Sequence, residues 1–289
     1  MSTDIAFILL AGVILGLVQG VSEWLPISSK TQIIIASTFL LGLTFAQAYT
    51  LGLFLELGTF FAAVIYFRRE LITVFKSIVG RGGVDGRLLL RYLIVVTVIT
   101  GVMGVAIYKA VESLSLGSAI GGPMLVLGAV LILDGLFIRF SRSRMAPRKK
   151  LEDMKLKELV AIGFAQGLAA FPGVSRSGVT VSTMLVLGTD VRESFRLSFL
   201  ALIPASLGAT LVTLIFSRSD FTGNVALLSP TMLAVALVVS LVVGLVMIRW
   251  LLRVASADRI ITLVLAMGVL AIFGGILGVV FGAGHNLAS

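Results

Sequence analysis

The sequence predicts an all-α integral membrane protein. Of its 289 residues, 58% are hydrophobic and only 13% are charged, whereas soluble domains are close to half apolar and a quarter charged. The mean hydropathy is +1.12. The apolar residues form long runs of Leu, Ala, Val and Ile, as membrane helices do, while a membrane β-barrel would show short alternating segments. We therefore expect a single membrane domain over residues 1–289, in a multi-pass protein of the plasma membrane.

Basic residues gather in three short segments between the apolar runs. These segments are residues 68–91, residues 139–157 and the stretch from Arg249 to Arg259. Cytoplasmic loops of membrane proteins carry an excess of Lys and Arg, so we place all three in the cytoplasm. The net charge of +9 needs no nucleic-acid partner, because no platform of aromatic and basic residues accompanies it. The absence of cysteine excludes disulfides, a thiol nucleophile and a cysteine-bound metal.

Six apolar runs are long enough to cross a bilayer as helices. They cover residues 47–67, 92–110, 122–139, 196–216, 230–248 and 260–281. Two further apolar regions, 5–42 and 158–189, are interrupted in the middle by Pro, Ser and a charged residue, and neither holds two full spans. We predict that each is a re-entrant pair of half-helices. Irregular backbone at that depth must be surrounded by protein or a watery cavity.

The two re-entrant segments are predicted to enter from opposite faces. With the basic segments inside, region 158–189 must dip in from the cytoplasm and region 5–42 from outside. The stretch QGVSEWLPISSKT at the first break also resembles QGLAAFPGVSRSGVT at the second, and FLELGTFFAAV (54–64) resembles FLALIPASLGA (199–209). Three spans follow each break, so the second copy is inverted.

The sequence therefore predicts an inverted-topology repeat. Repeat 1 covers residues 5–139, repeat 2 covers residues 158–281, and residues 140–157 form a basic cytoplasmic linker. Inverted repeats with broken helices that meet near the midplane are typical of transporters, whose binding site lies between the breaks. We expect the functional site there.

Polar residues at the two breaks indicate a site for an anion, with phosphate the best fit. Half-helix N-termini offer backbone N–H groups and positive dipole ends, and an Arg adds a bidentate donor. Ser28 or Ser29 is a candidate nucleophile that needs a nearby base. Glu23, the only carboxylate at either break, is a candidate for that base or for a ligand of a divalent metal. The candidate residues are Gln19, Glu23, Ser28, Ser29, Lys30 and Gln32 at the first break and Gln166, Gly173, Ser175, Arg176, Ser177 and Thr180 at the second.

The stretches QGVSEWLPISS and FPGVSRSGVT resemble the two signature motifs of the undecaprenyl-diphosphate phosphatase family, the bacitracin-resistance type. The second motif, Pro-Gly-x-Ser-Arg-Ser-x-x-Thr, is met in full, and the resemblance runs from about residue 5 to residue 281. It implies six spans and two re-entrant segments in an inverted repeat. It also implies removal of the terminal phosphate of a polyprenyl diphosphate, with a divalent cation such as Mg²⁺ or Ca²⁺, which recycles the lipid carrier for wall glycans.

The resemblance also implies roles for individual residues. Glu23 matches the family's second acidic residue, a metal ligand or base, and Gln19 stands where many members have the first, a further metal ligand. Ser29 matches the proposed nucleophile. The diphosphate-binding loop is matched by Ser175, Arg176 and Thr180.

One position departs from the family pattern. Gln32 stands where the family usually has a His, and the chain's single His, His285, lies in the tail. If that His is an obligate base or nucleophile, the protein is slow or inactive; if Ser29 attacks with help from Glu23, the loss is tolerable. Lys30 would then partly compensate by binding phosphate. The departure is also consistent with a different polyprenyl substrate or a non-bacterial source.

Structural roles are alternatives for several of these residues. Arg176 could bind carbonyl groups of the turn, and Glu23 could pair with it across the two breaks. Ser28 and Ser29 could be helix N-caps. Glu56 lies in an apolar span with no evident partner, and Gly101 and Gly104 are expected to serve helix packing.

Two other functions stay open from the residues alone. The same architecture would suit a flippase or transporter of polyprenyl phosphate, or a homologue that binds the lipid without catalysis. Membrane lipids are expected partners, and a homodimer is allowed.

Overall fold

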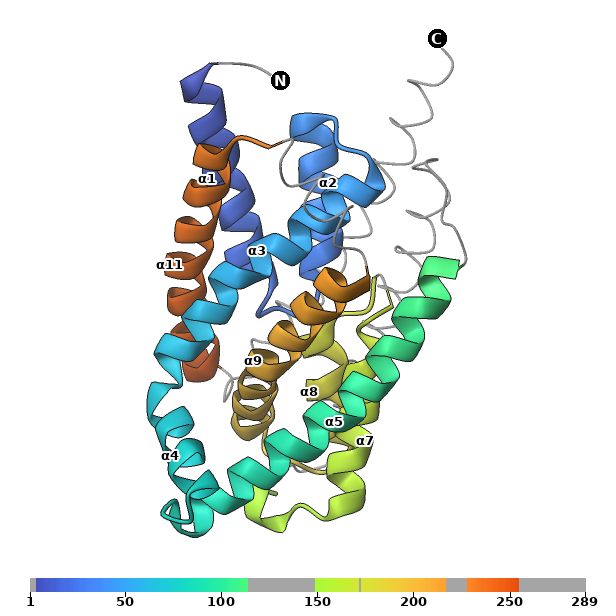
Figure 1. Ribbon diagram of the computed structural model, residues 1–289. Helices are drawn as coiled ribbons and strands as arrows, with labels where there is room; N and C mark the ends of the chain where they lie inside the picture. Colours follow the sequence, from blue (N-terminus) through green and yellow to red (C-terminus); the bar gives the residue numbers. More distant parts are fainter. Residues whose placement is uncertain (1–3, 114–148, 172, 217–227, 255–289) are drawn as a thin grey trace.

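The described part of the chain is built from helices joined by short turns. The computed structural model describes residues 4–113, 149–171, 173–216 and 228–254, and no strand occurs in those ranges. A short 3₁₀ turn covers Leu151–Asp153. The helices are α1 (Ile5–Ser22), α2 (Ser29–Leu41), α3 (Phe45–Tyr66), α4 (Arg68–Ile78), α5 (Gly83–Ser113), α7 (Leu156–Leu168), α8 (Arg176–Val186), α9 (Val191–Phe216) and α11 (Pro230–Val254) (Figure 1).

Five of these helices, α1, α3, α5, α9 and α11, are long and apolar enough to cross a membrane. The protein is therefore a multi-pass helical membrane protein. Four of the predicted spans fall on α3, α5, α9 and α11. The remaining two, 122–139 and 260–281, lie outside the described residues. Helix α1 meets the length and composition for a span, although the sequence analysis treats it as half of a re-entrant pair.

The chain reverses direction at both predicted breaks. Helix α1 ends before Glu23, and α2 begins at Ser29 and packs against α1. Helix α7 likewise ends at Leu168, and α8 returns against it from Arg176. Figure 1 shows the pair α1 and α2 in the upper part of the molecule and the pair α7 and α8 in the lower part, with both turns between them.

Local chemistry explains the second reversal. Gly173 has a φ of 98°, a conformation that side chains disfavour. Ser175 is the N-cap of α8, where its hydroxyl accepts a hydrogen bond from the Gly178 N–H at 3.2 Å. Pro172, the other residue that the sequence assigns to this turn, lies outside the described residues. In the first break Ser28 has a φ of 55° and its side chain makes no capping hydrogen bond.

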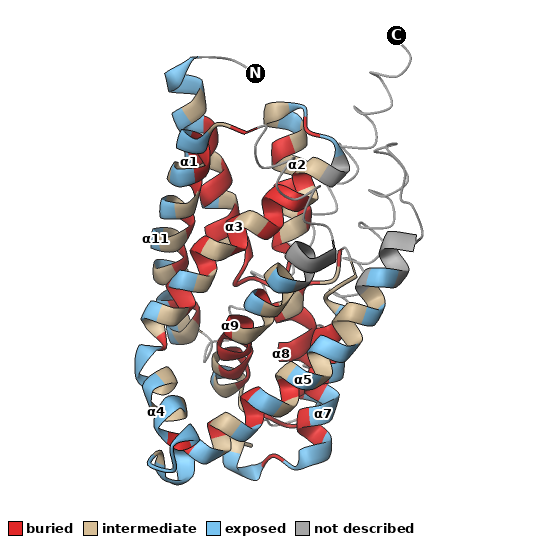
Figure 2. Ribbon diagram, viewed as in Figure 1, coloured by how far each residue is buried: buried red, intermediate tan, exposed pale blue. Residues whose placement is uncertain are grey.

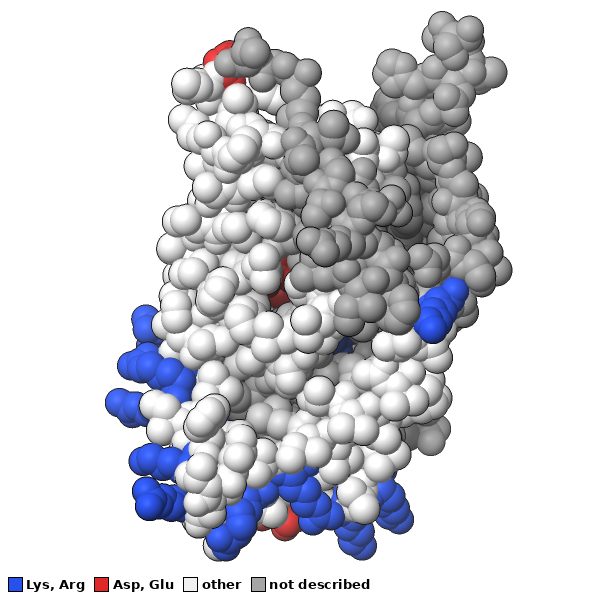
Figure 3. All heavy atoms as spheres, in the orientation of Figure 1, with Lys and Arg blue, Asp and Glu red and all other residues white. Residues whose placement is uncertain are grey.

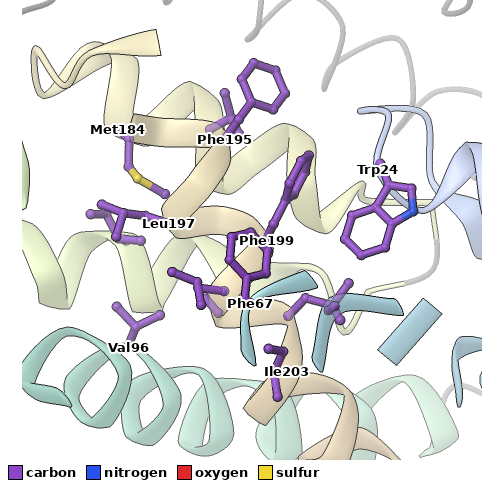
Figure 4. Close-up of a cluster of buried hydrophobic side chains, with 14 of the residues drawn as sticks. Trp24, Phe67, Val96, Met184, Phe195, Leu197, Phe199 and Ile203 are labelled. Carbon is purple, nitrogen blue, oxygen red and sulfur yellow. The ribbon is translucent and has the colours of Figure 1, made fainter. Parts of the chain in front are cut away.

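A cluster of large apolar side chains holds the two breaks together. Trp24, in the first turn, packs edge-on against Phe199 of α9, with ring centroids 5.0 Å apart. Met184 of α8 and Val96 of α5 join the same cluster (Figure 4). Figure 2 shows that α8 and the first half of α9 are mostly buried, whereas α1, α5 and α11 alternate buried and exposed sides. Exposed Leu and Val on those outer faces suit contact with lipid.

Helix α1 approaches α11 closely through three glycines one turn apart. A Cβ at Gly12 would lie 2.8 Å from the Met232 carbonyl oxygen, and one at Gly16 would lie 2.7 Å from the Ala236 carbonyl oxygen. Gly20 would meet Val243 at 2.8 Å. Small residues at this spacing allow membrane helices to pack backbone to backbone. Helix α1 is thereby fixed against the rest of the molecule.

Basic side chains gather at one end of the molecule. Figure 3 shows most of the visible Lys and Arg at the end that holds α4, the start of α5 and the start of α7. The described parts of the first two basic segments thus lie on the same side, as the sequence predicts. The third segment is described only as far as Val254, which ends α11.

Candidate active site

A cavity of about 180 Å³ lies between the two breaks. Its wall includes the N-terminal residues of both α2 and α8, together with parts of α3, α5, α7 and α9. Among the predicted site residues, those that line it are Glu23, Ser28, Ser29, Lys30, Gln166, Gly173, Ser175, Arg176 and Ser177. Residues that are far apart in the chain therefore share one cavity at the point where the two re-entrant pairs meet.

The carboxylate of Glu23 is the centre of the hydrogen-bond network. Its Oε2 accepts hydrogen bonds from Ser29 Oγ at 2.5 Å and from Gln19 Nε2 at 3.0 Å. Its Oε1 faces the guanidinium of Arg176 at 3.2 Å. Glu23 is buried, with 7% of its surface exposed. The network places an acceptor for the hydroxyl proton of Ser29 and a fixed cation on the same carboxylate.

Arg176 is held on both sides of its guanidinium. Nη2 contacts Glu23, and Nη1 donates to the Ser198 carbonyl oxygen of α9 at 3.0 Å. Both structural alternatives from the sequence, the pair with Glu23 and a bond to a carbonyl group, are therefore present. They leave Arg176 lining the cavity, where the guanidinium is fixed rather than free to rotate.

The N-terminus of α8 is tied directly to the first break. Ser177 Oγ donates to the Leu25 carbonyl oxygen at 3.0 Å and lies 3.3 Å from Ser175 Oγ. This bond crosses from the second re-entrant pair to the first. It fixes the positive end of the α8 dipole against the turn that carries Glu23. An anion in the cavity would meet the N-termini of two helices.

Lys30 forms a second ion pair inside the cavity. Its Nζ lies 2.5 Å from Oε1 of Glu56, which comes from the middle of α3. The side chain of Lys30 is 24% exposed and that of Glu56 only 7%. No partner for Glu56 is evident along the sequence, because its partner lies on a different helix.

Three predicted site residues do not line the cavity. Gln32 donates to the Ile27 carbonyl oxygen at 3.2 Å and so closes the first turn. Thr180 is buried, donates to the Arg176 carbonyl oxygen at 2.7 Å and contacts Ser198 Oγ. Gln19 lies behind Glu23 and reaches Thr59 with the same Nε2 at 3.4 Å. Their contacts make them supports for Glu23, Arg176 and the first turn.

The model of the bacitracin resistance protein BacA family matches residues 12–274. This chain belongs to the BacA family. An undecaprenyl-diphosphatase of Saccharolobus solfataricus is 48% identical over 270 residues, 93% of this chain and 96% of that protein. Proteins of the same name from Sulfurisphaera tokodaii and Pyrobaculum islandicum are 43% and 40% identical and cover 90% and 92% of this chain, and 94% and 96% of their own. The resemblance seen in the two motifs is thus confirmed over nearly the whole chain.

The cavity of this BacA-family protein also has polar residues that sequence reasoning did not assign. Thr97 and Thr100 of α5 line it, and Gln166 donates to Thr100 Oγ1 at 3.2 Å. Thr is common in membrane helices, so only the fold could single these two out. Gly101 and Gly104 line the cavity too. A Cβ on Gly101 would meet nothing within 4 Å, so Gly101 opens space rather than serving the helix packing expected of it.

A divalent cation fits the donors near Glu23 if substrate oxygens complete its shell. Gln19 Oε1 is buried and has no hydrogen-bond partner among the described residues, and Nε2 of the same amide donates to the Glu23 carboxylate. In the same ranges no group of three His, Cys, Asp or Glu could hold a metal unaided. Mg²⁺ is commonly held by one or two carboxylates together with substrate phosphates. The donor set therefore suits a cation that arrives with the diphosphate.

Proposed function

We propose that this BacA-family protein hydrolyses undecaprenyl diphosphate to undecaprenyl monophosphate and inorganic phosphate, and so recycles the lipid carrier for cell-envelope glycan synthesis. The observation that carries the proposal is the chain of contacts from Ser29 Oγ to Glu23 and on to Arg176. It combines a nucleophile, a base and a fixed cation in a cavity between two helix N-termini. The names of the relatives support the same substrate.

In the proposed reaction Ser29 attacks the terminal phosphorus. Glu23 Oε2 accepts the hydroxyl proton as the new O–P bond forms and the bridging P–O bond breaks, and undecaprenyl monophosphate leaves. Glu23 passes that proton to the departing phosphate oxygen and is a carboxylate again. Water then attacks the phosphoserine with Glu23 as the base, the P–O bond to Ser29 breaks, Ser29 Oγ takes the proton back from Glu23, and inorganic phosphate is released. Arg176 and the N-terminus of α8 bind the phosphate oxygens, whose charge must be stabilised in the transition state.

We propose that Glu23 and Gln19 would hold the divalent cation. When bound, the cation would neutralise charge on the phosphate oxygens. Removal of the cation with a chelator is expected to reduce turnover, and Mg²⁺ or Ca²⁺ is expected to restore it.

We also propose the finer topology, with six spans and two re-entrant pairs in an inverted repeat. The reversal of the chain at both breaks and the entry of the two pairs from opposite ends support it. The basic end would face the cytoplasm. Parts of α3, α5 and α9, which are long enough to cross the membrane, line the cavity, and this suits a headgroup whose isoprenoid chain stays in lipid. A homodimer stays a prediction.

The test is phosphate release by the purified protein from undecaprenyl diphosphate. Ser29→Ala should lower the rate at least ~10³-fold, because the attacking oxygen is gone. Ser28→Ala is the matched control, since the Ser28 hydroxyl accepts a hydrogen bond from Thr31, whereas it is the Ser29 hydroxyl that donates to Glu23. Ser28→Ala should retain more than about a tenth of the rate.

Equal rates for Ser29→Ala and wild type would exclude Ser29 as the nucleophile and leave Glu23 to activate water directly. No release by folded wild type that binds the lipid would contradict hydrolysis and favour a carrier or a non-catalytic binder. At present no observation favours a flippase, since the relatives are named for hydrolysis.

A further inference from the structure

The ion pair of Lys30 and Glu56 has no part in the proposed chemistry, although it lies in the same cavity. In the described part of the chain, four charged side chains line the cavity, and they form two pairs, Glu23 with Arg176 and Lys30 with Glu56. The first pair contacts the nucleophile. The second pair lies next to the nucleophile in the chain, because Lys30 is the residue after Ser29 in the first turn of α2.

Stability alone does not account for this pair. Glu56 lies within the span Gln47–Tyr66, with apolar neighbours on both sides. A buried ion pair loses hydration on both partners, and apolar residues of similar volume often serve stability equally well or better. Ionisable residues inside membrane segments instead mark binding or transport sites. The lysine is also the more exposed partner, so an anion in the cavity could reach it.

The formal charges of the described side chains that line the cavity balance in the absence of a ligand. Two carboxylates face two cations. A diphosphate headgroup brings two phosphate groups. In the proposed reaction the phosphate under attack binds beside Ser29, Glu23 and Arg176. The other phosphate, which stays on the lipid, needs a cation of its own as the bridging bond breaks and charge collects on the leaving group.

We propose that Lys30 and Glu56 form the subsite for the lipid-linked phosphate, in which Glu56 is a counter-ion that the headgroup displaces. The inference rests on the proposed function and deepens it. Glu56 positions Lys30 beside Ser29 in the empty site. The diphosphate takes Lys30 from Glu56, and after hydrolysis Glu56 recaptures Lys30 and weakens the hold on the lipid monophosphate. Lys30 thus provides the preference for a diphosphate, and Glu56 sets how easily the product leaves.

Equilibrium binding tests the subsite without turnover. The probes are inorganic methylenediphosphonate, which has two linked phosphonate groups and cannot be hydrolysed, and inorganic phosphate. Wild type should bind the diphosphonate more tightly than phosphate. Lys30→Met should weaken diphosphonate binding at least ~10-fold and phosphate binding far less, because a single phosphate needs only Arg176. Glu56→Gln should tighten diphosphonate binding about 10-fold, since nothing then competes for Lys30.

The double variant separates this role from a merely structural one. Lys30→Met leaves Glu56 buried and unpaired, so it is expected to be less stable; Lys30→Met with Glu56→Gln removes both charges. When Lys30→Met is already present, adding Glu56→Gln should not change diphosphonate binding further. In turnover, Glu56→Gln should show stronger inhibition by undecaprenyl monophosphate and a lower kcat. Glu158→Gln is the matched control, because it removes the partner of Lys149 outside the cavity.

The inference is overturned if Lys30→Met weakens both probes equally, if Glu56→Gln weakens diphosphonate binding, or if its effect persists without Lys30. Selective diphosphonate binding that responds to both variants as expected, in a wild type that releases no phosphate, would support the subsite and contradict the proposed hydrolysis. The two proposals can therefore fail separately.

Discussion

At the scale of single residues, Glu23 decides what the site can do. One oxygen of its carboxylate accepts the hydroxyl of Ser29 and the other faces Arg176. In the proposed reaction this one side chain would orient the nucleophile, accept its proton and hold the Arg176 guanidinium in place. None of these three roles needs the His that the family usually has at the position of Gln32. Gln32 instead bonds the turn that carries Ser28 and Ser29.

Arg176→Lys tests whether the site needs the several N–H donors of a guanidinium or only its positive charge. A lysine keeps the charge but cannot contact Glu23 and the Ser198 carbonyl oxygen while also binding phosphate. We expect phosphate release to fall about 10²-fold or more, and Arg176→Ala to abolish it in a folded protein. Thermal unfolding in detergent provides the folding control. Activity close to wild type in Arg176→Ala would show that another group binds the phosphate.

At the scale of elements, the two re-entrant pairs are held in different ways. Helix α1 depends on close backbone contact with α11 through its glycines. Helix α8 depends on its N-cap and on the bond from Ser177 to the first turn. Since both breaks contribute to one cavity, a shift of either pair would separate Glu23 from Arg176.

Gly16→Leu should move α1 away from α11. The added side chain would meet the Ala236 carbonyl oxygen and Val239, neither of which can yield without a shift of the helix. Overpacking of this kind costs about 1–3 kcal/mol, so the Tm in detergent should fall and turnover should fall with it. Gly101→Ala is the control, because its Cβ meets nothing within 4 Å and its Tm should be unchanged or slightly higher. A normal Tm in Gly16→Leu would argue against this packing.

The start of α7 carries a pH-dependent contact. Glu158 accepts hydrogen bonds from Lys149 Nζ and from the Lys155 N–H, each at 2.8 Å. Burial alone would raise the pKa of the Glu158 carboxyl, but these hydrogen bonds and the charges of the two lysines outweigh it and hold that pKa below its ordinary value of 4.5. Glu158 lies in the first turn of a helix outside the five candidate spans.

The direction of the pH effect follows from that lowered pKa. The unfolded state binds the proton more readily than the folded state, so the contact stabilises the fold above about pH 4.5 and its contribution is lost as the pH falls further. We expect wild type to be more stable than Glu158→Gln near neutral pH, with the difference shrinking below about pH 4.5. Tm measured for both proteins from about pH 3 to about pH 7 checks this. A difference that grows toward acid would contradict it.

At the scale of the whole molecule, the basic end and the cavity lie in different places. Most of the basic side chains visible in Figure 3 lie at one end and the start of α1 lies at the other, while the cavity lies between the breaks. This asymmetry orients the protein in the membrane. The proposed inverted repeat would bring one re-entrant pair to the site from each side of the membrane.

Cysteine labelling tests the orientation, and the chain suits it because it has no cysteine. Ile5→Cys at the start of α1 should react with a membrane-impermeant maleimide added to intact cells. Val79→Cys after α4 and Glu152→Cys before α7, both exposed, should react only after the membrane is opened. Labelling of Val79→Cys and Glu152→Cys on opposite sides would contradict the proposed topology.

The sequence alone determined the class of the protein, the four described spans that were predicted, the positions of both breaks and the residues that meet at them. Apolar runs of membrane length, Pro and Gly in the middle of such runs, and a complete Ser-Arg-Ser motif are local signals, and local signals can be read along the chain. Glu23, Ser29 and Arg176 were identified this way before their contacts were known.

Only the tertiary structure decided which of these residues touch, because contacts between distant segments depend on how helices pack. It paired Arg176 with Glu23, gave Glu56 its partner Lys30 and made Thr97 part of the cavity wall. It also showed that Gln32 and Thr180 do not line the cavity and that their side chains bond to the carbonyl oxygens of Ile27 and Arg176 instead. A charged residue in a membrane helix indicates a functional site from the sequence alone. Which residue pairs with that charge depends on the helix that packs against it.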